Sequence, residues 1–298
     1  MNCASLYDDL KLRAYLSRIG LRLKKSSGQH FMIDLPLIEE IAECLGGKRK
    51  VVEIGAGLGS LTCQLAKNHD IVWAVEKDAR FKEGFEENLA PFEGVQFVRE
   101  DFLEFNPLRF DLSPDGSSEF AGNIPYNITV PIIEKLIEDR SFYSKGVLTV
   151  QKEIADRITA SPGGKEISPL TYLVKSFFSA SQIREIPPDS FFPPPAVYSS
   201  VLQIEPLDEP RISVDPDFFF SLIRGIYNYR RKTIRKSLSI IEKVDLNKSE
   251  IKKVLRDSGI DPMRRPERIS LEEFDVLCKS ILLLKSEKGN SEGSFSWK

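Results

Sequence analysis

The chain has 298 residues, of which 41% are hydrophobic and 29% are charged, and its formal net charge at pH 7 is −2. This composition is typical of a globular protein, and so small a net charge gives no sign of a nucleic-acid partner. The length exceeds what a single core usually fills, so two domains are expected. Residues 1–20 lack the apolar segment of a signal peptide. No hydrophobic run is long enough to span a membrane, so we expect a cytoplasmic protein.

The cysteines and histidines are too few and too scattered to predict a metal site. The chain contains only Cys3, Cys44, Cys63, Cys278, His30 and His69, and their spacing matches no pattern of metal ligands. We therefore expect free thiols and no bound metal, and free thiols without a signal peptide indicate the cytoplasm.

The N-terminal region is basic. Residues 10–33 contain no acid and six basic side chains, which are Lys11, Arg13, Arg18, Arg22, Lys24 and Lys25. Such a run is usually a solvated face of a helix, and the alternative is an arm that binds phosphate groups.

The most informative stretch begins with residues 51–54, which are predicted to form a buried strand. Three glycines follow at alternate positions, Gly55, Gly57 and Gly59, and a helix is predicted from Ser60 onward. This arrangement brings the backbone close to a ligand and points helix N–H groups at it. A dinucleotide-binding loop would have glycine where Ser60 stands. At the end of the strand, the carboxylate of Glu53 suits a cationic ligand such as S-adenosylmethionine (SAM) better than a pyrophosphate.

Two further predicted strands, residues 71–75 and 95–98, also lead into acids. Glu76 lies 21 residues beyond Gly55, which is the spacing of an acid that binds both ribose hydroxyls of a nucleotide. Asp101, after the third strand, is placed to accept a hydrogen bond from an adenine amino group. Acids that end three successive strands predict a nucleotide site at the ligand-binding edge of an open α/β sheet.

The fourth predicted strand, residues 120–122, leads into the sequence Asn123-Ile124-Pro125-Tyr126. This form is typical of enzymes that methylate an exocyclic amino group, whose lone pair is delocalised into the base. The side-chain oxygen of Asn123 and the carbonyl of Ile124 would each accept one amine hydrogen and aim the lone pair at a methyl donor. Pro125 fixes the turn, and Tyr126 offers a ring on which a flipped base stacks.

In these motifs the chain resembles the KsgA-type rRNA adenine N6,N6-dimethyltransferases, over residues 21–278. The resemblance rests on residues 28–34, the glycine turn, residues 123–126, residues 191–197 and residues 229–238. It implies a Rossmann-like class I SAM-dependent methyltransferase sheet with a small all-α C-terminal domain, and an antiparallel strand at residues 197–205. The family usually has Asn where His30 stands and Leu where Met32 stands.

The resemblance also implies the roles of individual residues. The cofactor would contact His30, Met32, Glu53, Gly55, Gly57, Glu76, Asp101 and Asn123. The catalytic group would comprise Asn123, Ile124, Pro125, Tyr126 and Phe191, the last as the opposite wall of the adenine slot. RNA would bind to Arg22, Lys24, Lys25, Arg230, Arg231, Lys232 and Arg235.

The C-terminal part has a different composition. Residues 206–216 are proline-rich and are predicted to be a linker. We therefore expect a methyltransferase domain with its basic arm at 1–206, a helical RNA-binding domain at 207–284 and a disordered tail at 285–298. A helical pattern covers 218–241, and six basic residues without an acid between 224 and 236 are typical of RNA binding. Its expected core residues are Leu222, Ile226, Ile234 and Leu238, and Ser270 and Glu273 predict a capping box.

The predicted function is methyl transfer from SAM, twice per base, to N6 of two adjacent adenosines in the 3′-terminal hairpin of small-subunit (16S) rRNA. The enzyme would be a cytoplasmic monomer that acts on a pre-30S particle in ribosome biogenesis, without a metal or a membrane. An erythromycin-resistance methyltransferase acting on large-subunit rRNA is the alternative within the family. An NAD dehydrogenase would require glycine at position 60, and a non-catalytic RNA-binding module would not require residues 123–126.

Overall fold

The computed structural model describes residues 3–21, 23, 30–47, 49–241 and 244–288. The chain forms two compact units, one of residues 1–155 and 179–206 and the other of residues 156–178 and 207–298. The sequence predicted a single domain boundary near residue 206. In the structure, residues 156–178 also belong to the unit that contains the C-terminal helices. The reason is a long-range contact, because Tyr172 Oη donates to the carbonyl of Ile269 at 2.8 Å and the Tyr172 ring packs on Phe274.

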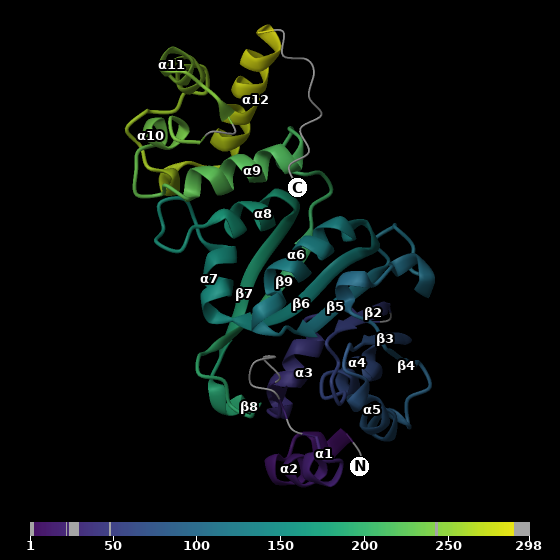
Figure 1. The fold of residues 1–298 in the computed structure, drawn as a ribbon. Coiled ribbons are helices and arrows are strands. Elements are labelled where there is room, and N and C mark those ends of the chain that lie inside the picture. The colour runs from purple at the N-terminus through teal and green to yellow at the C-terminus, as the bar shows by residue number, and fades with distance from the viewer. Residues whose placement is uncertain (1–2, 22, 24–29, 48, 242–243, 289–298) are drawn as a thin grey trace. The chain divides into compact units, whose positions relative to one another are not determined.

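The first unit is built on a seven-stranded sheet of order β4-β3-β2-β5-β6-β9-β7 (Figure 1). The strands are β2 (Lys50–Ile54), β3 (Ile71–Val75), β4 (Val95–Val98), β5 (Ser118–Asn123), β6 (Tyr143–Gln151), β7 (Phe178–Ile186) and β9 (Ser199–Pro206). The first five strands of the order pair in parallel, and β9 pairs with β6 in the antiparallel direction. The predicted α/β fold and the antiparallel strand are thus confirmed. The chain order reverses between β2 and β5, which is where such sheets bind ligands.

Helices flank this sheet. They are α3 (Leu35–Glu43), α4 (Thr62–Asn68), α5 (Lys82–Leu89), α6 (Thr129–Glu138) and α7 (Lys152–Thr159), the last of which continues into the second unit. Apolar side chains of α3 and α4, such as Ile38 and Leu65, form one core with Val51 and Val72 of the sheet. Helix α4 begins two residues later than predicted, after Gly59, whose positive φ of 91° is not helical.

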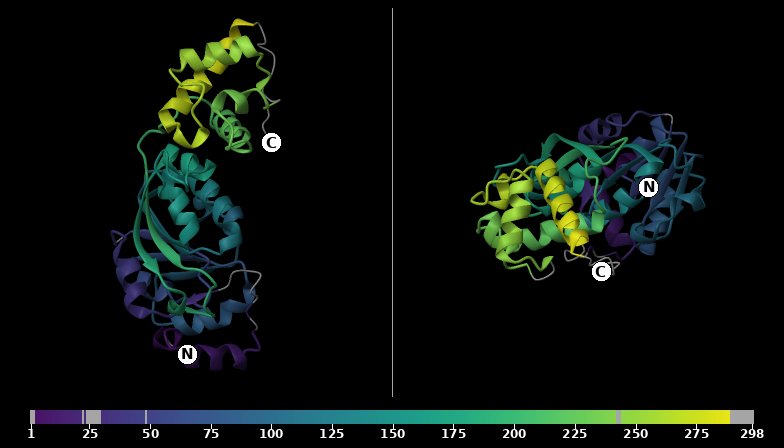
Figure 2. Two further views of the ribbon diagram at one scale, coloured as in Figure 1. Left: turned by 90° about the vertical axis from the view of Figure 1, so that its left-hand side faces the viewer. Right: turned by 90° about the horizontal axis from the view of Figure 1, so that it is seen from above.

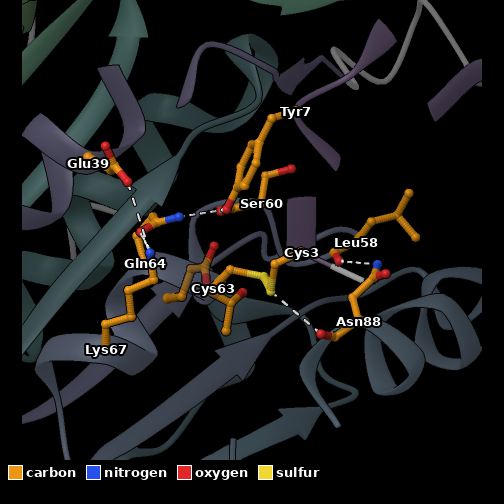
Figure 3. Close-up of a disulfide and its surroundings, with 11 residues drawn as sticks. Cys3, Tyr7, Glu39, Leu58, Ser60, Cys63, Gln64, Lys67 and Asn88 are labelled. Atoms are coloured by element: carbon orange, nitrogen blue, oxygen red, sulfur yellow. Dashed lines mark hydrogen bonds and ion pairs between the residues drawn. A yellow bond between two sulfur atoms is a disulfide. The ribbon is translucent and has the colours of Figure 1, made fainter. Parts of the chain in front are cut away.

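Two short helices precede the sheet, α1 (Cys3–Leu6) and α2 (Asp9–Arg18). They lie beside the loops and helices that follow β2 and β3 (Figure 1; Figure 2), in a second core that joins Leu12 of α2 to Leu58 and Phe85. A disulfide between Cys3 and Cys63 links α1 to α4 (Figure 3). The prediction of free thiols is therefore wrong for these two cysteines, because a sequence separation of 60 residues gives no sign of their contact. The other two cysteines are free.

The second unit is helical. Its helices are α8 (Pro169–Phe177), α9 (Pro216–Tyr227), α10 (Ile234–Leu238), α11 (Lys248–Asp257) and α12 (Leu271–Glu287). The predicted helical stretch 218–241 is two helices, because a turn interrupts it at 228–233 and Thr233 caps α10. The four predicted core residues are all buried, and the capping box of Ser270 and Glu273 is confirmed.

The last helix extends further than predicted. Helix α12 ends at Glu287, so residues 285–287 are helical and do not belong to the expected tail. Residues 289–298 lie outside the described part of the chain. Within that described part, no helix has the length and apolar character needed to cross a membrane.

Candidate active site

A cavity of about 550 Å³ lies at the carboxyl ends of β2, β3 and β5. This volume is typical of a small-molecule site. The predicted residues that line it are His30, Met32, Glu53, Gly55, Gly57, Glu76, Asp101, Asn123 and Pro125. The sheet gathers in one place residues from Glu53 to Pro125, because parallel strands end at the same edge. His30 and Met32 join them from the segment of β1 (Phe31–Met32), which belongs to a separate two-stranded sheet.

The glycine turn after β2 has a backbone that other residues rarely adopt. Gly55 and Gly57 have positive φ angles of 76° and 56°. A Cβ atom on Gly57 would also lie 2.9 Å from a ring carbon of Phe31. Both the conformation and the close approach thus require glycine, and they bring the Gly57 N–H to the floor of the cavity.

Glu53 is buried at the end of β2, and the hydroxyl of Thr62 donates to its carboxyl at 2.5 Å. Burial raises the pKa of Glu53 to about 8, which outweighs the effect of this hydrogen bond. Burial therefore disfavours the charged form of the side chain, which the sequence predicted to face the ligand as an anion. A cation bound beside Glu53 would favour its ionised form.

Glu76 follows β3 and is held by two backbone donors. Its carboxylate accepts from Gly57 N at 2.9 Å and from Asp78 N at 2.8 Å. Burial nevertheless raises the pKa of Glu76 above its ordinary value. These bonds fix the carboxylate at the cavity wall, and each oxygen retains a lone pair for a further donor.

Asp101 follows β4 and accepts from Leu103 N at 3.1 Å and from Lys77 Nζ at 2.6 Å. Burial tends to raise the pKa of Asp101, but its hydrogen bonds to Lys77 and Leu103 prevail and lower it. Asp101 therefore remains an anionic acceptor at the side of the cavity.

Asn123, at the end of β5, is oriented by the N-terminal segment. Its Nδ2 donates to the carbonyl of His30 at 2.8 Å, and His30 Nδ1 donates to the carbonyl of Pro193 at 2.6 Å. Within the described residues the amide oxygen of Asn123 has no hydrogen-bond partner, so it is available as an acceptor. His30 thus keeps a structural role at the position where the resemblance implied Asn.

The backbone after Asn123 follows the predicted turn. Ile124 N donates to the carbonyl of Thr149 at 2.9 Å, and the Ile124 side chain is buried and does not line the cavity. Only its carbonyl is therefore a candidate acceptor. Pro125 lines the cavity, and Tyr126 begins the short 3-10 helix η5 (Tyr126–Ile128). The placement of the Tyr126 ring lies outside the described part.

Phe191 does not occupy its predicted place. It lies in the short strand β8 (Phe191–Phe192), which pairs with β1 (Phe31–Met32) so that Phe191 faces Met32 in the register. Its side chain is only 2% exposed and belongs to the core between the sheet and α3. The expectation that Phe191 forms a wall of the adenine slot is therefore wrong for this conformation.

The predicted RNA-binding residues fall into two groups. Arg22, Lys24 and Lys25 lie outside the described residues. Arg230, Arg231 and Lys232 are in the turn after α9, and Arg235 is in α10. All four of these side chains are exposed and, within the described part of the second unit, form no ion pair. This charge is therefore available to a polyanion.

Two polar groups of the cavity were not predicted from the sequence. Ser60 Oγ and Glu100 Oε2 are buried without a hydrogen-bond partner among the described residues, and both residues line the cavity. Buried polar groups normally have partners, so these two atoms suggest a polar ligand. The residues fit SAM, since Glu76 suits its ribose hydroxyls and Asp101 its adenine amino group. The sequence contained one indication that Ser60 could contact a ligand, because this serine stands where a dinucleotide-binding loop has glycine.

Glu76 provides a test of the cavity as the SAM site. We expect Glu76→Ala to weaken SAM binding at least tenfold, because a hydrogen bond to a charged group contributes ~1.5–3 kcal/mol. Calorimetric titration with SAM measures the affinity, and Glu83→Ala, an exposed acid in the first turn of α5, is the control. Unaltered SAM binding by the Glu76 variant would remove this residue from the site.

Comparison with known proteins agrees with this geometry. The family model "Ribosomal RNA adenine dimethylase" matches residues 20–277. Ribosomal RNA small subunit methyltransferase A of Halothermothrix orenii is 34% identical over 92% of this chain and 93% of its own length. The protein of the same name from Bacillus licheniformis is 35% identical over 91% of this chain and 96% of its own length.

Solved structures agree in fold. A dimethyladenosine transferase from Plasmodium falciparum superposes with a TM-score of 0.68 at 24% identity, over 86% of this chain and 96% of that one. The 23S rRNA methyltransferase ErmE superposes with a TM-score of 0.63 at 24% identity, over 83% of this chain and 97% of that one. Because the family model and the sequence relatives each cover most of its length, the chain belongs to the ribosomal RNA adenine dimethylase family, as its motifs predicted.

Proposed function

We propose that this protein transfers methyl groups from SAM to N6 of two adjacent adenosines in the 3′-terminal hairpin of small-subunit rRNA. It acts as a monomer on an assembling small ribosomal subunit. That substrate is the ground for a cytoplasmic location, because the Cys3–Cys63 disulfide removes the argument from free thiols. The observation that carries this proposal is the Asn123 amide, which the carbonyl of His30 holds with its oxygen available beside the cavity.

The residues of the site orient an amine rather than ionise it. SAM, when bound, supplies an electrophilic methyl group on a sulfonium. The Asn123 oxygen and the Ile124 carbonyl each accept one hydrogen from N6, which favours a pyramidal nitrogen with its lone pair exposed. Such preorganised acceptors act mainly in the transition state. The chain needs no general base, because the methylated nitrogen is positively charged and therefore loses its proton readily.

The choice of the small subunit rests on the sequence relatives. Those at 34% and 35% identity are both named small subunit methyltransferase A. ErmE, the large-subunit enzyme, is less similar and supports only the fold. We therefore favour small-subunit rRNA over the erythromycin-resistance type of substrate.

The direct test is tritium transfer from labelled SAM to purified small subunits that lack the modification, followed by mapping of the labelled nucleosides. We expect N6,N6-dimethyladenosine at two adjacent positions near the 3′ end of the rRNA. Label on large-subunit rRNA in a parallel reaction would favour the alternative substrate, and no label on either subunit would overturn the proposal.

The exposed basic turn after α9 predicts a salt effect. In the double variant Arg231→Ala and Lys232→Ala, we expect weaker binding of small subunits. The slope of log affinity against log salt should fall by about one unit per lost phosphate contact. The matched control replaces Lys248 and Lys252, two exposed lysines of α11. SAM affinity should not change, and a wild-type slope would mean that Arg231 and Lys232 only face solvent.

A further inference from the structure

A second cavity in the first unit has no role in the reaction described above. It measures about 630 Å³ and lies between helix α2 and strand β8 with the proline that follows it. Its lining includes Arg13 and Leu16 of α2, Leu21, Phe192 and Pro193. The family model begins at residue 20, so the α2 wall comes from a segment outside the family match.

The chemistry of this cavity suits a nucleobase. The guanidinium carbon of Arg13 lies 4.4 Å from the centroid of the Phe192 ring, so a flat cation rests on an aromatic face. Arg13 Nε donates to Asp9 Oδ1 at 2.8 Å, and 55% of the side chain is exposed. Within the described residues the terminal nitrogens of Arg13 form no hydrogen bond. A planar cation that rests one face on an aromatic ring can stack its other face on a base and attract a phosphate.

Two hydrogen bonds connect this cavity to the amine site. The carbonyl of Pro193, in the cavity wall, accepts from His30 Nδ1 at 2.6 Å. The carbonyl of His30 accepts from Asn123 Nδ2 at 2.8 Å. A single residue therefore separates the wall of the second cavity from the side chain that orients the target amine.

We infer that this cavity binds the nucleotide next to the target adenosine, with its base stacked on the face of the Arg13 guanidinium that is turned away from Phe192. The inference rests on the proposed function, because an RNA strand with one adenosine at Asn123 must place its neighbour close by. Charge supports the assignment, since the ion pair of Arg13 with Asp9 uses Nε and, within the described residues, leaves the terminal nitrogens to donate to a phosphate. The segment that supplies Arg13 is also where this chain extends beyond the family match.

The chain offers a matched control for Arg13. Arg18 lies on the same helix, its guanidinium carbon is 4.9 Å from the centroid of the Tyr15 ring, and its side chain is 63% exposed. It is also near an acid, Glu87, at 3.5 Å. Arg18 does not line the cavity. The two arginines therefore carry the same charge in similar settings, and only Arg13 is placed to contact the bound nucleotide.

The experiment measures methylation of small subunits lacking the modification, as kcat and KM for the subunit, with SAM affinity measured separately by calorimetry. We expect Arg13→Ala to raise the KM about tenfold, within the range of one lost base stack, and to leave SAM affinity unchanged. Arg18→Ala should raise the KM less than twofold. Arg13→Lys keeps the charge but not the planar face, so it should raise the KM severalfold.

Equal effects of Arg13→Ala and Arg18→Ala would overturn the inference, because long-range attraction alone would then account for both. A wild-type KM for Arg13→Lys would overturn it too, and this variant also serves if Arg13→Ala fails to fold. These outcomes are distinct from failure of the proposed function, in which the wild-type protein itself does not methylate small subunits.

Discussion

Replacement of Asn123 by alanine is expected to lower the rate of methyl transfer about 10²–10³-fold while SAM binding weakens only modestly. The side chain is fixed at one end by its 2.8 Å hydrogen bond to the carbonyl of His30, and its oxygen is left available for the substrate. An acceptor that acts mainly in the transition state contributes typically ~2.7–4 kcal/mol. The glycine turn and the acids of the cavity are untouched by the change, so the cofactor site should persist.

Single-turnover assays at saturating SAM separate the chemical step from binding. Asn68→Ala is a suitable control, since Asn68 is an exposed asparagine at the end of α4 in the same unit. A rate for the Asn123 variant close to that of the wild type would mean that the amine is oriented by other groups. The protein would then have to be regarded as a SAM-binding protein that methylates a different substrate group.

A second large effect is expected on stability, from His69→Leu. His69 Nε2 lies 2.8 Å from Glu119 Oε2, and both side chains are almost fully buried. His69 Nδ1 faces the carbonyl of Leu65 at 2.9 Å, and Glu119 also accepts from Gly46 N at 2.7 Å. Removal of the imidazole leaves a buried carboxylate without one of its hydrogen-bond donors. The free energy of unfolding should therefore fall by about 3–5 kcal/mol.

This loss should depend on pH. Burial tends to raise the pKa of Glu119, but the hydrogen bonds from His69 and Gly46 prevail and lower it. As the pH falls, Glu119 therefore binds a proton at a higher pH in the unfolded wild-type chain than in the folded protein. The free energy of unfolding of the wild type consequently falls through the acid range. In the variant, protonation neutralises the unpaired carboxylate. The deficit of the variant should therefore be largest near pH 7 and should be smaller at about pH 4, below the ordinary pKa of a glutamate.

Urea unfolding at both pH values measures this difference. The chain has two tryptophans, Trp73 in β3 and Trp297. With Trp297 replaced by Phe, tryptophan fluorescence comes from Trp73 alone and reports on unfolding of the first unit. The double variant His69→Leu and Glu119→Leu should recover much of the lost stability, since apolar replacement of a buried pair is often nearly neutral. A loss below about 1 kcal/mol in the single variant would contradict the stabilising role of this buried pair.

The sequence alone determined the features that depend on local pattern and on backbone chemistry. Apolar runs of strand length predicted the strands of the sheet, and alternate glycines predicted a turn that only glycine can form at Gly57. Acids at strand ends predicted which side chains line the cavity, because parallel strands share one edge. The Asn123-to-Tyr126 motif predicted the family, which the comparisons confirm.

Only the tertiary structure decided the features that depend on which distant residues meet. The register of β8 against β1 turns Phe191 into the core, and a contact across 60 residues pairs Cys3 with Cys63. The raised pKa of Glu53 follows from its burial, which no local pattern reveals. Contacts with α9 and α12 likewise place α8 in the second unit. In each case the deciding quantity is the environment created by packing, which is a property of the whole fold and not of neighbouring residues in the chain.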